Sequence, residues 1–433
     1  MTQFTGSISS KREAEKSLKD TFLKVVLALQ HLIAMFGATV LVPMLTGLDP
    51  SVALFSAGVG TLIFHLCTKG KVPVFLGSSF AFIPVIVAVS QKYGDLRYAQ
   101  GGIVVVGIIY VLVSLLIKKV GLSNIKRILP AQVVGPMIIV IGLNLIPTAL
   151  DMTGATSLLA GDKSALLGVV IAIITLSIAL LIKRFSNGFL SQVSILIAVA
   201  VGYTISLLMG QVATAEIQNA TLVAIPNFTL PKFDMGAIAI IAPVVLAVFM
   251  EHVGDITTNG EVVGQNFIED PGLNRTLLGD GVATLAAGFI GGPANTTYGE
   301  NTGVLAITKN YNPAILRITA VFAILLSFIS KFGAVIRTIP QSVMGGISLI
   351  LFSMIAIVGF KTIKREKVEF NFFNVIIMVA ILFVGLSGNF LSKPISINIT
   401  ESVSISGLSL AAIVGVVLNI IFTQVNKFIK KDI

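Results

Sequence analysis

The fold of this chain is decided by the stretch Pro293-Ala-Asn-Thr-Thr-Tyr-Gly-Glu300-Asn-Thr-Gly-Val-Leu-Ala-Ile-Thr-Lys309. It lies between two strongly apolar segments, so its hydropathy places it at membrane depth, yet it holds a proline, small polar residues and a carboxylate. A charged side chain near the centre of a bilayer costs roughly 2.5–3.5 kcal/mol. Backbone that is not helical occurs at that depth only where it is buried in protein or lines a cavity. The stretch therefore predicts a polar binding site inside a membrane protein.

The composition agrees with a chain that crosses a lipid bilayer many times. Of 433 residues, 55% are hydrophobic and 12% are charged, with a mean hydropathy of +0.96, whereas a soluble domain has about 25% charged residues. The net charge of +10 comes from short basic clusters between apolar spans, which indicates membrane topology and not a nucleic-acid partner. The single cysteine, Cys67, excludes an intramolecular disulfide and a cysteine metal cluster.

Fourteen apolar spans can be placed along the chain, from 22–45 to 405–426. Each has about the 20 residues that a spanning helix needs, except the short third (73–90) and tenth (294–308). An even count puts both termini on one side of the membrane. With a cytoplasmic N-terminus, only seven of the 30 lysine and arginine residues fall in outer loops, as the positive-inside rule expects. We therefore expect both termini to be cytoplasmic.

The two halves of the chain resemble each other. Gly58-Val-Gly-Thr-Leu62 matches Gly281-Val-Ala-Thr-Leu285, and Pro73-Val-Phe-Leu-Gly-Ser-Ser79 lies opposite Ala294-Asn-Thr-Thr-Tyr-Gly-Glu300. Seven spans per copy is an odd number, so the second copy has to insert upside down. The sequence thus predicts two inverted repeats of seven segments, an arrangement typical of secondary transporters.

Each copy contains one irregular stretch, in which a few extended residues lead into a short helix. The first helix would begin near Phe80 and the second near Glu300. The two extended pieces are predicted to pair as a buried antiparallel ladder, because backbone groups at this depth have no water to bond. The two helix N-termini would then converge with free N–H groups facing a shared cavity. The predicted fold class is all-α and polytopic, with two short antiparallel strands in segments 3 and 10.

Three carboxylates in the spans are candidates for the chemistry of this site. Glu251 and Asp255 are four residues apart in segment 8 and share one helix face, while Glu300 opens the short helix of segment 10. Two close carboxylates in a poorly hydrated site resist ionising together, so the pair predicts a proton acceptor. The alternative is a structural role with hydroxyl partners such as Thr297, and it weighs most for Asp255.

Two histidines and two aromatic residues accompany the carboxylates. His31 and His252 occupy matching positions in the two copies, and they either support the site or pack as ordinary hydrogen-bonding residues. They lack the ligand spacing of a metal site, and we expect no metal and no cofactor. Phe80 and Tyr298 flank the irregular stretches, where an aromatic face suits a planar heterocycle; ordinary packing is the alternative.

The stretch after Tyr298 resembles the signature of the nucleobase–ascorbate transporter family, or nucleobase–cation symporter-2. That signature reads Gln, Glu or Pro, then Asn-x-Gly-x-x-x-x-Thr, then Arg, Lys or Gly. Its fixed positions are matched by Glu300, Asn301, Gly303, Thr308 and Lys309. Glutamate at the first position is typical of the bacterial uracil permeases of this family. Three further stretches resemble those permeases, namely Gln30–Pro43, Leu76–Phe82 and Glu251–Gly254.

The resemblance implies an organisation into two domains and a homodimer formed through one of them. After a cytoplasmic tail (1–21), segments 1–4 (22–120) and 8–11 (234–331) would form a core domain. Segments 5–7 (121–233) and 12–14 (332–433) would form a gate domain, which would make the dimer contact.

The resemblance also implies how uracil would bind. Glu251 and Glu300 would accept its ring N–H groups. The backbone around Phe80, Tyr298 and Gly299 would meet its carbonyls, with Phe80 against the ring. Ser79 would be a further substrate-binding residue. The residues that would support the site are His31, His252, Asn301, Gly303 and Thr308.

The leading hypothesis is a transporter of the bacterial inner membrane that imports uracil by proton symport with alternating access. Glu251 and Asp255 would carry the proton, although in the family the position of Asp255 is often histidine. The alternatives are a transporter of the same fold for another nucleobase, such as xanthine, and a passive nucleobase channel. We expect no enzyme, because the sequence has no nucleophile elbow, zinc helix motif or P-loop.

Overall fold

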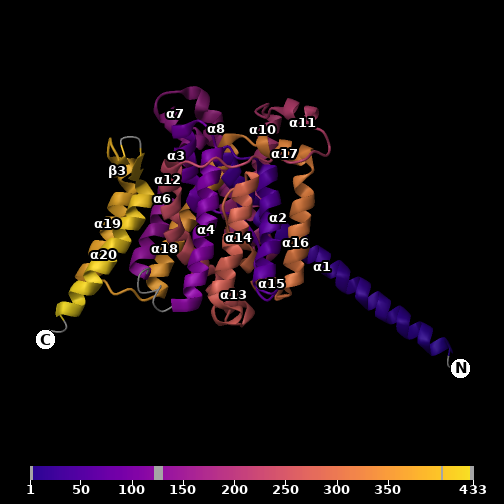
Figure 1. Ribbon diagram of the computed structural model, residues 1–433. Coiled ribbons are helices and arrows are strands. Elements are labelled where there is room, and N and C mark those ends of the chain that lie inside the picture. Colours follow the sequence, from indigo (N-terminus) through magenta and orange to yellow (C-terminus); the bar gives the residue numbers. More distant parts are fainter. Residues whose placement is uncertain (1–2, 121–129, 401–402, 430–433) are drawn as a thin grey trace.

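The computed structural model describes residues 3–120, 130–400 and 403–429, and most of them form long helices packed side by side (Figure 1). The elements are, in chain order, α1 (Gln3–Thr46), α2 (Pro50–Cys67), β1 (Leu76–Ser78), η1 (Phe80–Phe82), α3 (Ile83–Tyr93), α4 (Arg97–Val120), α6 (Ala131–Thr153), α7 (Ala155–Leu159), η2 (Lys163–Ala165), α8 (Leu166–Phe185), α9 (Phe189–Gln192), α10 (Ser194–Leu208), α11 (Thr214–Asn219), α12 (Met235–Ile241), η3 (Ala242–Val244), α13 (Val245–Val263), η4 (Ile268–Gly272), α14 (Leu273–Ile290), β2 (Asn295–Thr297), α15 (Gly299–Thr308), α16 (Pro313–Ser327), α17 (Ser330–Arg337), α18 (Gln341–Arg365), α19 (Phe372–Phe390), β3 (Ser396–Thr400), β4 (Val403–Ser406) and α20 (Gly407–Ile429).

Many of these helices can cross a membrane. Within the described part of the chain, nine helices are long and apolar enough to do so, or ten if α16 and α17, which meet at 82°, count as one bent span. The third and tenth predicted segments take the expected form of a strand followed by a short helix. The mostly helical, polytopic fold is thus confirmed, while the count of fourteen segments and their inverted repeat stay predictions. The fifth predicted span begins at about residue 126, outside the described residues.

The N-terminal helix extends beyond its apolar part. The apolar part of α1 covers Thr21–Thr46, but the helix begins at Gln3, so no helix boundary separates the predicted tail from the first segment. The start of α1 and the end of α20 lie toward the same end of the bundle, and α7, α11 and α17 lie at the opposite end (Figure 1).

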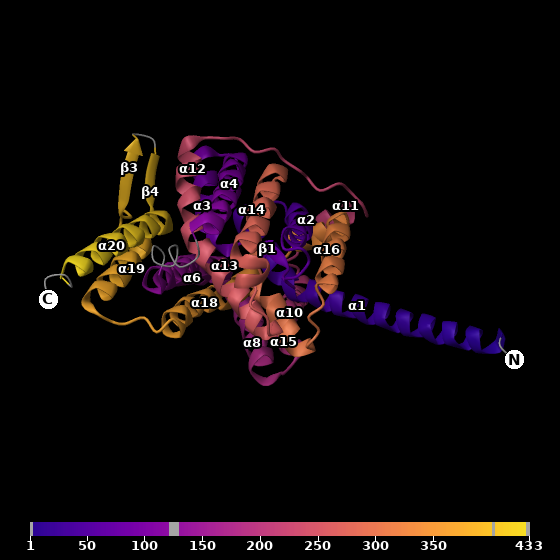
Figure 2. The ribbon, with the colours of Figure 1, turned by 60° about the horizontal axis from the view of Figure 1, so that its bottom comes forward.

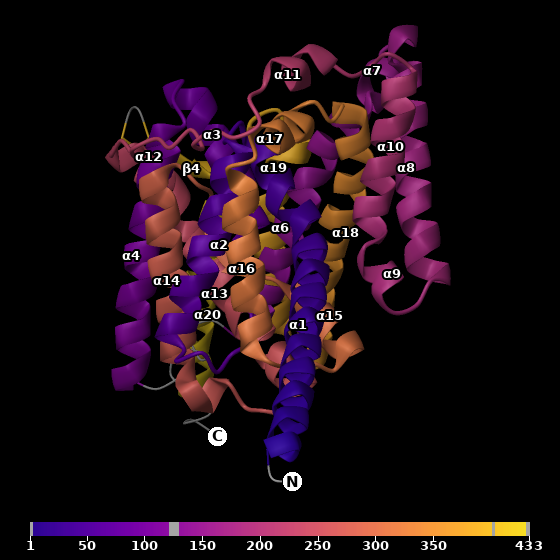
Figure 3. The same cartoon turned by 90° about the vertical axis from the view of Figure 1, so that its right-hand side faces the viewer.

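The helices pack in two groups whose contacts are close because glycines face each other. In one group α14 packs against α2 and α4; in the other α6 packs against α18, with α8 and α10 beside α18 (Figure 3). A Cβ atom added at Gly107 of α4 would lie 2.8 Å from the carbonyl oxygen of Gly281 on α14. One added at Gly359 of α18 would lie 2.6 Å from the carbonyl oxygen of Gly135 on α6. Small residues of this kind allow helices to associate in lipid, where no hydrophobic drive brings them together.

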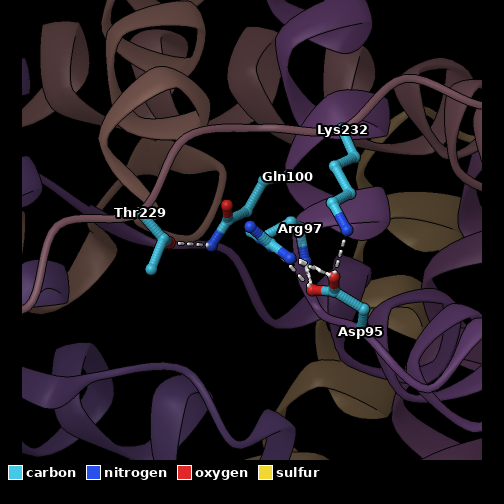
Figure 4. Close-up of polar contacts among 5 residues, drawn as sticks. All are labelled: Asp95, Arg97, Gln100, Thr229 and Lys232. Carbon is cyan, nitrogen blue, oxygen red and sulfur yellow. Dashed lines mark hydrogen bonds and ion pairs between the residues drawn. The ribbon is translucent and has the colours of Figure 1, made fainter.

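The connection between α11 and α12 is fastened to the start of α4 (Figure 4). Asp95 accepts hydrogen bonds from Arg97, with NH2 at 2.8 Å, and pairs with Lys232 at 3.0 Å. Gln100 donates to the Thr229 hydroxyl at 2.7 Å. The Arg97 donors hold the pKa of the Asp95 carboxyl well below its usual range. Polar contacts therefore hold the connection between α11 and α12 against residues at the start of α4.

Substituting Gly359→Ala should destabilise the protein, because the new methyl group would meet the Gly135 carbonyl at 2.6 Å. Overpacking of this kind costs about 1–3 kcal/mol. Gly388→Ala on α19 is the matched control, since its nearest neighbour, a Pro394 carbon, would be at 3.6 Å. Thermal unfolding of the detergent-purified proteins should show a lower midpoint for Gly359→Ala only. An unchanged midpoint would show that α6 and α18 can move apart at no cost.

Candidate functional site

Two short strands pair inside the bundle, at the two extended stretches that the sequence predicted. β1 and β2 are antiparallel, with Leu76 opposite Thr297 and Ser78 opposite Asn295. Every residue of both strands is buried. The predicted buried ladder is confirmed, and it joins segments that lie more than 200 residues apart in the sequence.

The ladder continues past the strands and so engages two donors of the predicted site. The Ser79 N–H donates to the carbonyl of Ala294 at 2.9 Å, and the Tyr298 N–H donates to the carbonyl of Phe75 at 3.1 Å. A helix begins directly after each of these residues, η1 in the first half and α15 in the second. The first N–H groups of a helix have no partner within it. The N–H groups without a partner inside their own helix therefore begin one residue later, in η1 and α15.

Two threonines hold the strands in the same way. The Leu76 N–H donates to the hydroxyl of Thr61 on α2 at 2.9 Å. The Asn295 N–H donates to the hydroxyl of Thr284 on α14 at 3.3 Å, and this hydroxyl also donates to the Asn295 carbonyl at 3.1 Å. Thr61 and Thr284 are the matching threonines of the repeated Gly-Val-x-Thr-Leu motif. Their matching positions in the two halves of the chain were the signal for this shared role.

The ring of Tyr298 is part of the protein's packing. Its hydroxyl donates to the Ser78 carbonyl at 3.0 Å and lies 3.4 Å from the Thr39 hydroxyl. The side chain is 3% exposed and belongs to a buried cluster with Met35 and Phe75. In this structure the Tyr298 ring therefore packs among buried side chains, which was the alternative to a ligand contact, and its hydroxyl stabilises the end of β1.

Phe80 has a different environment. It is only partly buried, and its ring lies edge-on to Phe352 of α18, with centroids 6.5 Å apart. Phe80 therefore lies between the two helix groups, at the start of η1.

The carboxylates of α13 face an open space between the two groups. A cavity of about 790 Å³ is lined by Glu251 and Asp255 on one side, and by residues of α6 and α18 on the other. Lys361 and Arg365 supply positive charge to its wall. Glu300 does not line this cavity; it lies in the first turn of α15 and is partly buried.

The three predicted carboxylates are nonetheless grouped. Glu251 and Asp255 line the same cavity, and α13, which carries them, packs against α15, whose first turn holds Glu300. Asp255 also accepts a hydrogen bond from the Thr297 hydroxyl at 2.8 Å, which joins α13 to β2. The sequence suggested Thr297 as a hydroxyl partner if Asp255 had a structural role, and the structure contains this hydrogen bond.

The two matching histidines are held differently. His31 Nδ1 lies 3.1 Å from the side-chain amide nitrogen of Asn301, which also donates to the His31 carbonyl at 3.1 Å. His252 Nδ1 lies 2.8 Å from a carboxylate oxygen of Asp280, and its Nε2 lies 3.0 Å from the Thr276 hydroxyl. Each histidine thus links its helix to another element beside the site. Its place between Gly279 and Gly281 made Asp280 a secondary candidate for holding a helix contact, but nothing in its spacing identified His252 as the partner.

The rest of the signature shapes α15. Thr308 donates to the carbonyl of Val304 at 2.9 Å, and the helix ends at Lys309, whose φ of 51° is left-handed. Gly303 lies in the middle of the helix. Asn259 of α13 donates to the Thr302 hydroxyl at 3.1 Å, a contact that the sequence did not suggest.

No group of three or more histidine, cysteine, aspartate or glutamate residues that could hold a metal ion occurs in residues 3–120, 130–400 and 403–429. The polar groups of the site are carboxylates, which accept hydrogen bonds, and amides and backbone N–H groups, which donate them. They suit a small polar molecule that offers both hydrogen-bond donors and acceptors.

Solved structures of other transporters share this fold. The transmembrane domain of the cyanobacterial bicarbonate transporter BicA is 14% identical and matches with a TM-score of 0.62, covering 92% of this chain and 96% of that one. The murine anion transporter Slc26a9, in an inward-facing state, is 11% identical and matches with a TM-score of 0.70, covering 93% and 68%. At these identities the likeness concerns the fold alone.

Sequence relatives extend over nearly the whole chain. The uracil permease of Bacillus subtilis (strain 168) is 41% identical over 427 residues, 96% of this chain and 97% of the relative. The uracil permease of Escherichia coli (strain K12) is 40% identical over 404 residues, 93% and 92%. Permeases are transporters and not enzymes. A family model described as the permease family matches residues 23–394. The chain therefore belongs to this family, the nucleobase–ascorbate transporters whose signature it carries, and is a multi-pass membrane transport protein.

Proposed function

We propose that this protein imports uracil across the bacterial inner membrane by proton symport with alternating access. The observation that carries the proposal is that α13, with Glu251 and Asp255, packs against α15, with Glu300, beside two helix starts that a buried strand pair holds together. Relatives about 40% identical over most of the chain are named uracil permeases, which supports uracil as the substrate.

Uracil suits the donors and acceptors of this site. Its ring N–H groups would donate to Glu251 and Glu300, and its carbonyls would accept from the free N–H groups at the starts of η1 and α15, near Phe80 and Gly299. Phe80 would cover the face of the ring. Ser79 and Tyr298 would act through the ladder that places these helix starts, since their own N–H groups are already bonded.

The supporting residues would keep the two short helices in place. His31 and Asn301 join α1 to α15, and His252 joins α13 to α14. Gly303 and Thr308 would set the path and the end of α15. Their effect on transport would therefore be indirect.

The proposed transporter has fourteen transmembrane segments in two inverted repeats. The core domain (22–120 and 234–331) would carry the site, and the gate domain (121–233 and 332–433) would form the other wall of the cavity beside Glu251. Both termini would be cytoplasmic, with a homodimer formed through the gate domains. The position of Phe80 against Phe352 of α18 is consistent with a core surface that meets a gate surface.

A coupled ion is needed because uracil is neutral and cannot be concentrated by the membrane potential alone. Glu251 and Asp255 would carry the proton, since they share one helix face and both line the cavity. Protonation of this face would remove charge from the site and let the loaded core move past the gate.

Two other functions can be distinguished from uracil symport by uptake measurements. A transporter of the same fold for xanthine or another nucleobase would show uptake that xanthine inhibits and uracil does not. A passive channel would never raise the internal uracil concentration above the external one, and an uncoupler would not affect its flux.

Substituting Glu300→Gln should lower uracil uptake by about tenfold or more, because a hydrogen bond to a charged group contributes about 1.5–3 kcal/mol. The measurement is uptake of labelled uracil by permease-deficient cells at matched expression. Glu261→Gln is the control, since Glu261 lies on α13 but is exposed and does not line the cavity. Uptake by Glu300→Gln at the parent's rate would remove Glu300 from the binding site, and absence of uptake by the parent would overturn the uracil assignment.

Substituting Asp255→Asn should separate exchange from accumulation. The amide oxygen can still accept the Thr297 hydroxyl, but the side chain no longer binds the coupling proton. In proteoliposomes, uracil counterflow should persist while accumulation driven by a proton gradient is lost. Thr297→Val is the control, because it removes the hydrogen bond and keeps the carboxylate. Accumulation by Asp255→Asn equal to that of the parent would place the proton elsewhere.

A further inference from the structure

The chain between α11 and α12, residues 220–234, forms a strap across one end of the bundle (Figure 1, Figure 2). Three of its backbone N–H groups donate to carbonyls at the ends of other helices: Ala224 to Phe328 after α16 at 3.0 Å, Thr229 to Ile290 in α14 at 3.3 Å, and Lys232 to Arg97 in α4 at 2.9 Å. The helix α4 is long and apolar enough to span a membrane, and so is α16 when it is counted with α17. The strap therefore lies at the level where these helices reach the membrane boundary.

Two glycines allow the strap to lie directly on the helix ends. A Cβ atom at Gly101 of α4 would collide with the Lys232 carbonyl oxygen, and one at Gly291, which follows α14, would collide with the Thr229 hydroxyl. The side chain of Gln100 also donates to that hydroxyl (Figure 4). The strap is thus a closely packed part of the bundle surface and not a loose loop.

The two edges of the strap differ in polarity. Asn227 and Thr229 line a cavity of about 1160 Å³, whose wall also bears Asp95 and Arg337. Between Ala220 and Pro231 the sequence contains no charged residue. The strap and the first residue of α12 together carry six large apolar side chains that are each more than half exposed, namely Leu222, Val223, Ile225, Leu230, Phe233 and Met235.

This exposed apolar surface indicates a contact with a membrane. On soluble surfaces contiguous apolar patches are small, and larger ones mark contacts with a membrane or with another protein. The position of the strap selects the membrane, because its backbone is bonded to the ends of spanning helices. The Leu222 carbonyl also accepts from the N–H of Ser330 at 3.1 Å, where α17 begins and the chain turns by 82° from α16. The boundary between lipid headgroups and acyl chains accepts apolar side chains at this level.

We propose that the strap is a membrane-interface anchor. Its six exposed apolar side chains, from Leu222 to Met235, insert between the headgroups and the acyl chains of the leaflet at this end of the bundle, while its other edge faces the polar cavity. Because the strap is bonded to α4, α14 and the turn after α16, the anchor couples these helix ends to the lipid surface. The inserted run is almost free of charge, so the contact does not require an anionic lipid. The inference does not depend on which substrate is transported.

The test is tryptophan fluorescence, since the chain contains no tryptophan of its own. The full-length Leu230→Trp protein is reconstituted in phosphatidylcholine that is brominated either near the headgroup end or near the methyl end of an acyl chain. An interfacial segment is buried about 5–10 Å into the boundary region, so the headgroup-end bromines should remove about half of the emission. The methyl-end bromines should remove clearly less. Phe233→Trp, which exchanges one aromatic side chain for another, is the second variant and should give the same order.

The controls place a tryptophan in water and in the acyl chains. Glu216→Trp on α11, an exposed residue that lines the polar cavity, should respond to iodide in the aqueous phase and to neither brominated lipid. Val321→Trp on α16 is 44% exposed and precedes the end of that helix at Ser327, which places it about 9 Å deeper; methyl-end bromines should quench it more strongly. Adding phosphatidylglycerol should leave the quenching of Leu230→Trp unchanged. Thermal unfolding of each variant establishes that it is folded.

Either of two emission patterns would contradict the anchor. Quenching of Leu230→Trp and Phe233→Trp by iodide, but by neither brominated lipid, would place the strap in water. Blue-shifted emission that neither iodide nor brominated lipid quenches would place these side chains against a second copy of the chain or another protein.

Discussion

The buried ladder between β1 and β2 is the interaction on which the site depends. An unpaired backbone N–H or carbonyl inside a membrane costs several kcal/mol, so chain that is not helical there has to find partners within the protein. Each strand finds them in the other strand and in a threonine of the preceding helix, Thr61 or Thr284. Because these bonds are satisfied, two helices can begin in the interior, where their first N–H groups have no partner within the helix. The proposed binding site at membrane depth depends on that arrangement.

The carboxylates of the site are stabilised in a similar way, by hydrogen-bonding partners and by contact with a cavity. Asp255 has the Thr297 hydroxyl, and Glu251 reaches a cavity of about 790 Å³ whose far wall bears Lys361 and Arg365. His252 and Asp280 pair with each other out of contact with solvent. Polar groups at membrane depth are expensive and mark functional sites. Here they concentrate on α13 and on the elements that touch it.

Much of this could be predicted because the repeat is visible in the sequence. The offset between Pro73–Ser79 and Ala294–Glu300 identified the strands and their pairing, and a four-residue spacing placed Glu251 and Asp255 on one face. The family resemblance implied that the backbone around Tyr298 would meet a uracil carbonyl; in this structure the Tyr298 N–H donates to the Phe75 carbonyl, a bond that the sequence did not suggest. The contact between His252 and Asp280 depends on how α13 crosses α14, a packing angle that no local pattern contains.

The pairing of β1 with β2 has a consequence for how the protein is made. Leu76 and its partner Thr297 are separated by most of the first half of the chain and the start of the second. During synthesis, the first strand therefore enters the membrane long before its partner exists. Contacts of such high sequence separation slow folding and prolong the exposure of unpaired edges. Biogenesis thus includes an interval in which the first half holds an unfinished site. Synthesis of β2 and α15 is the event that completes it.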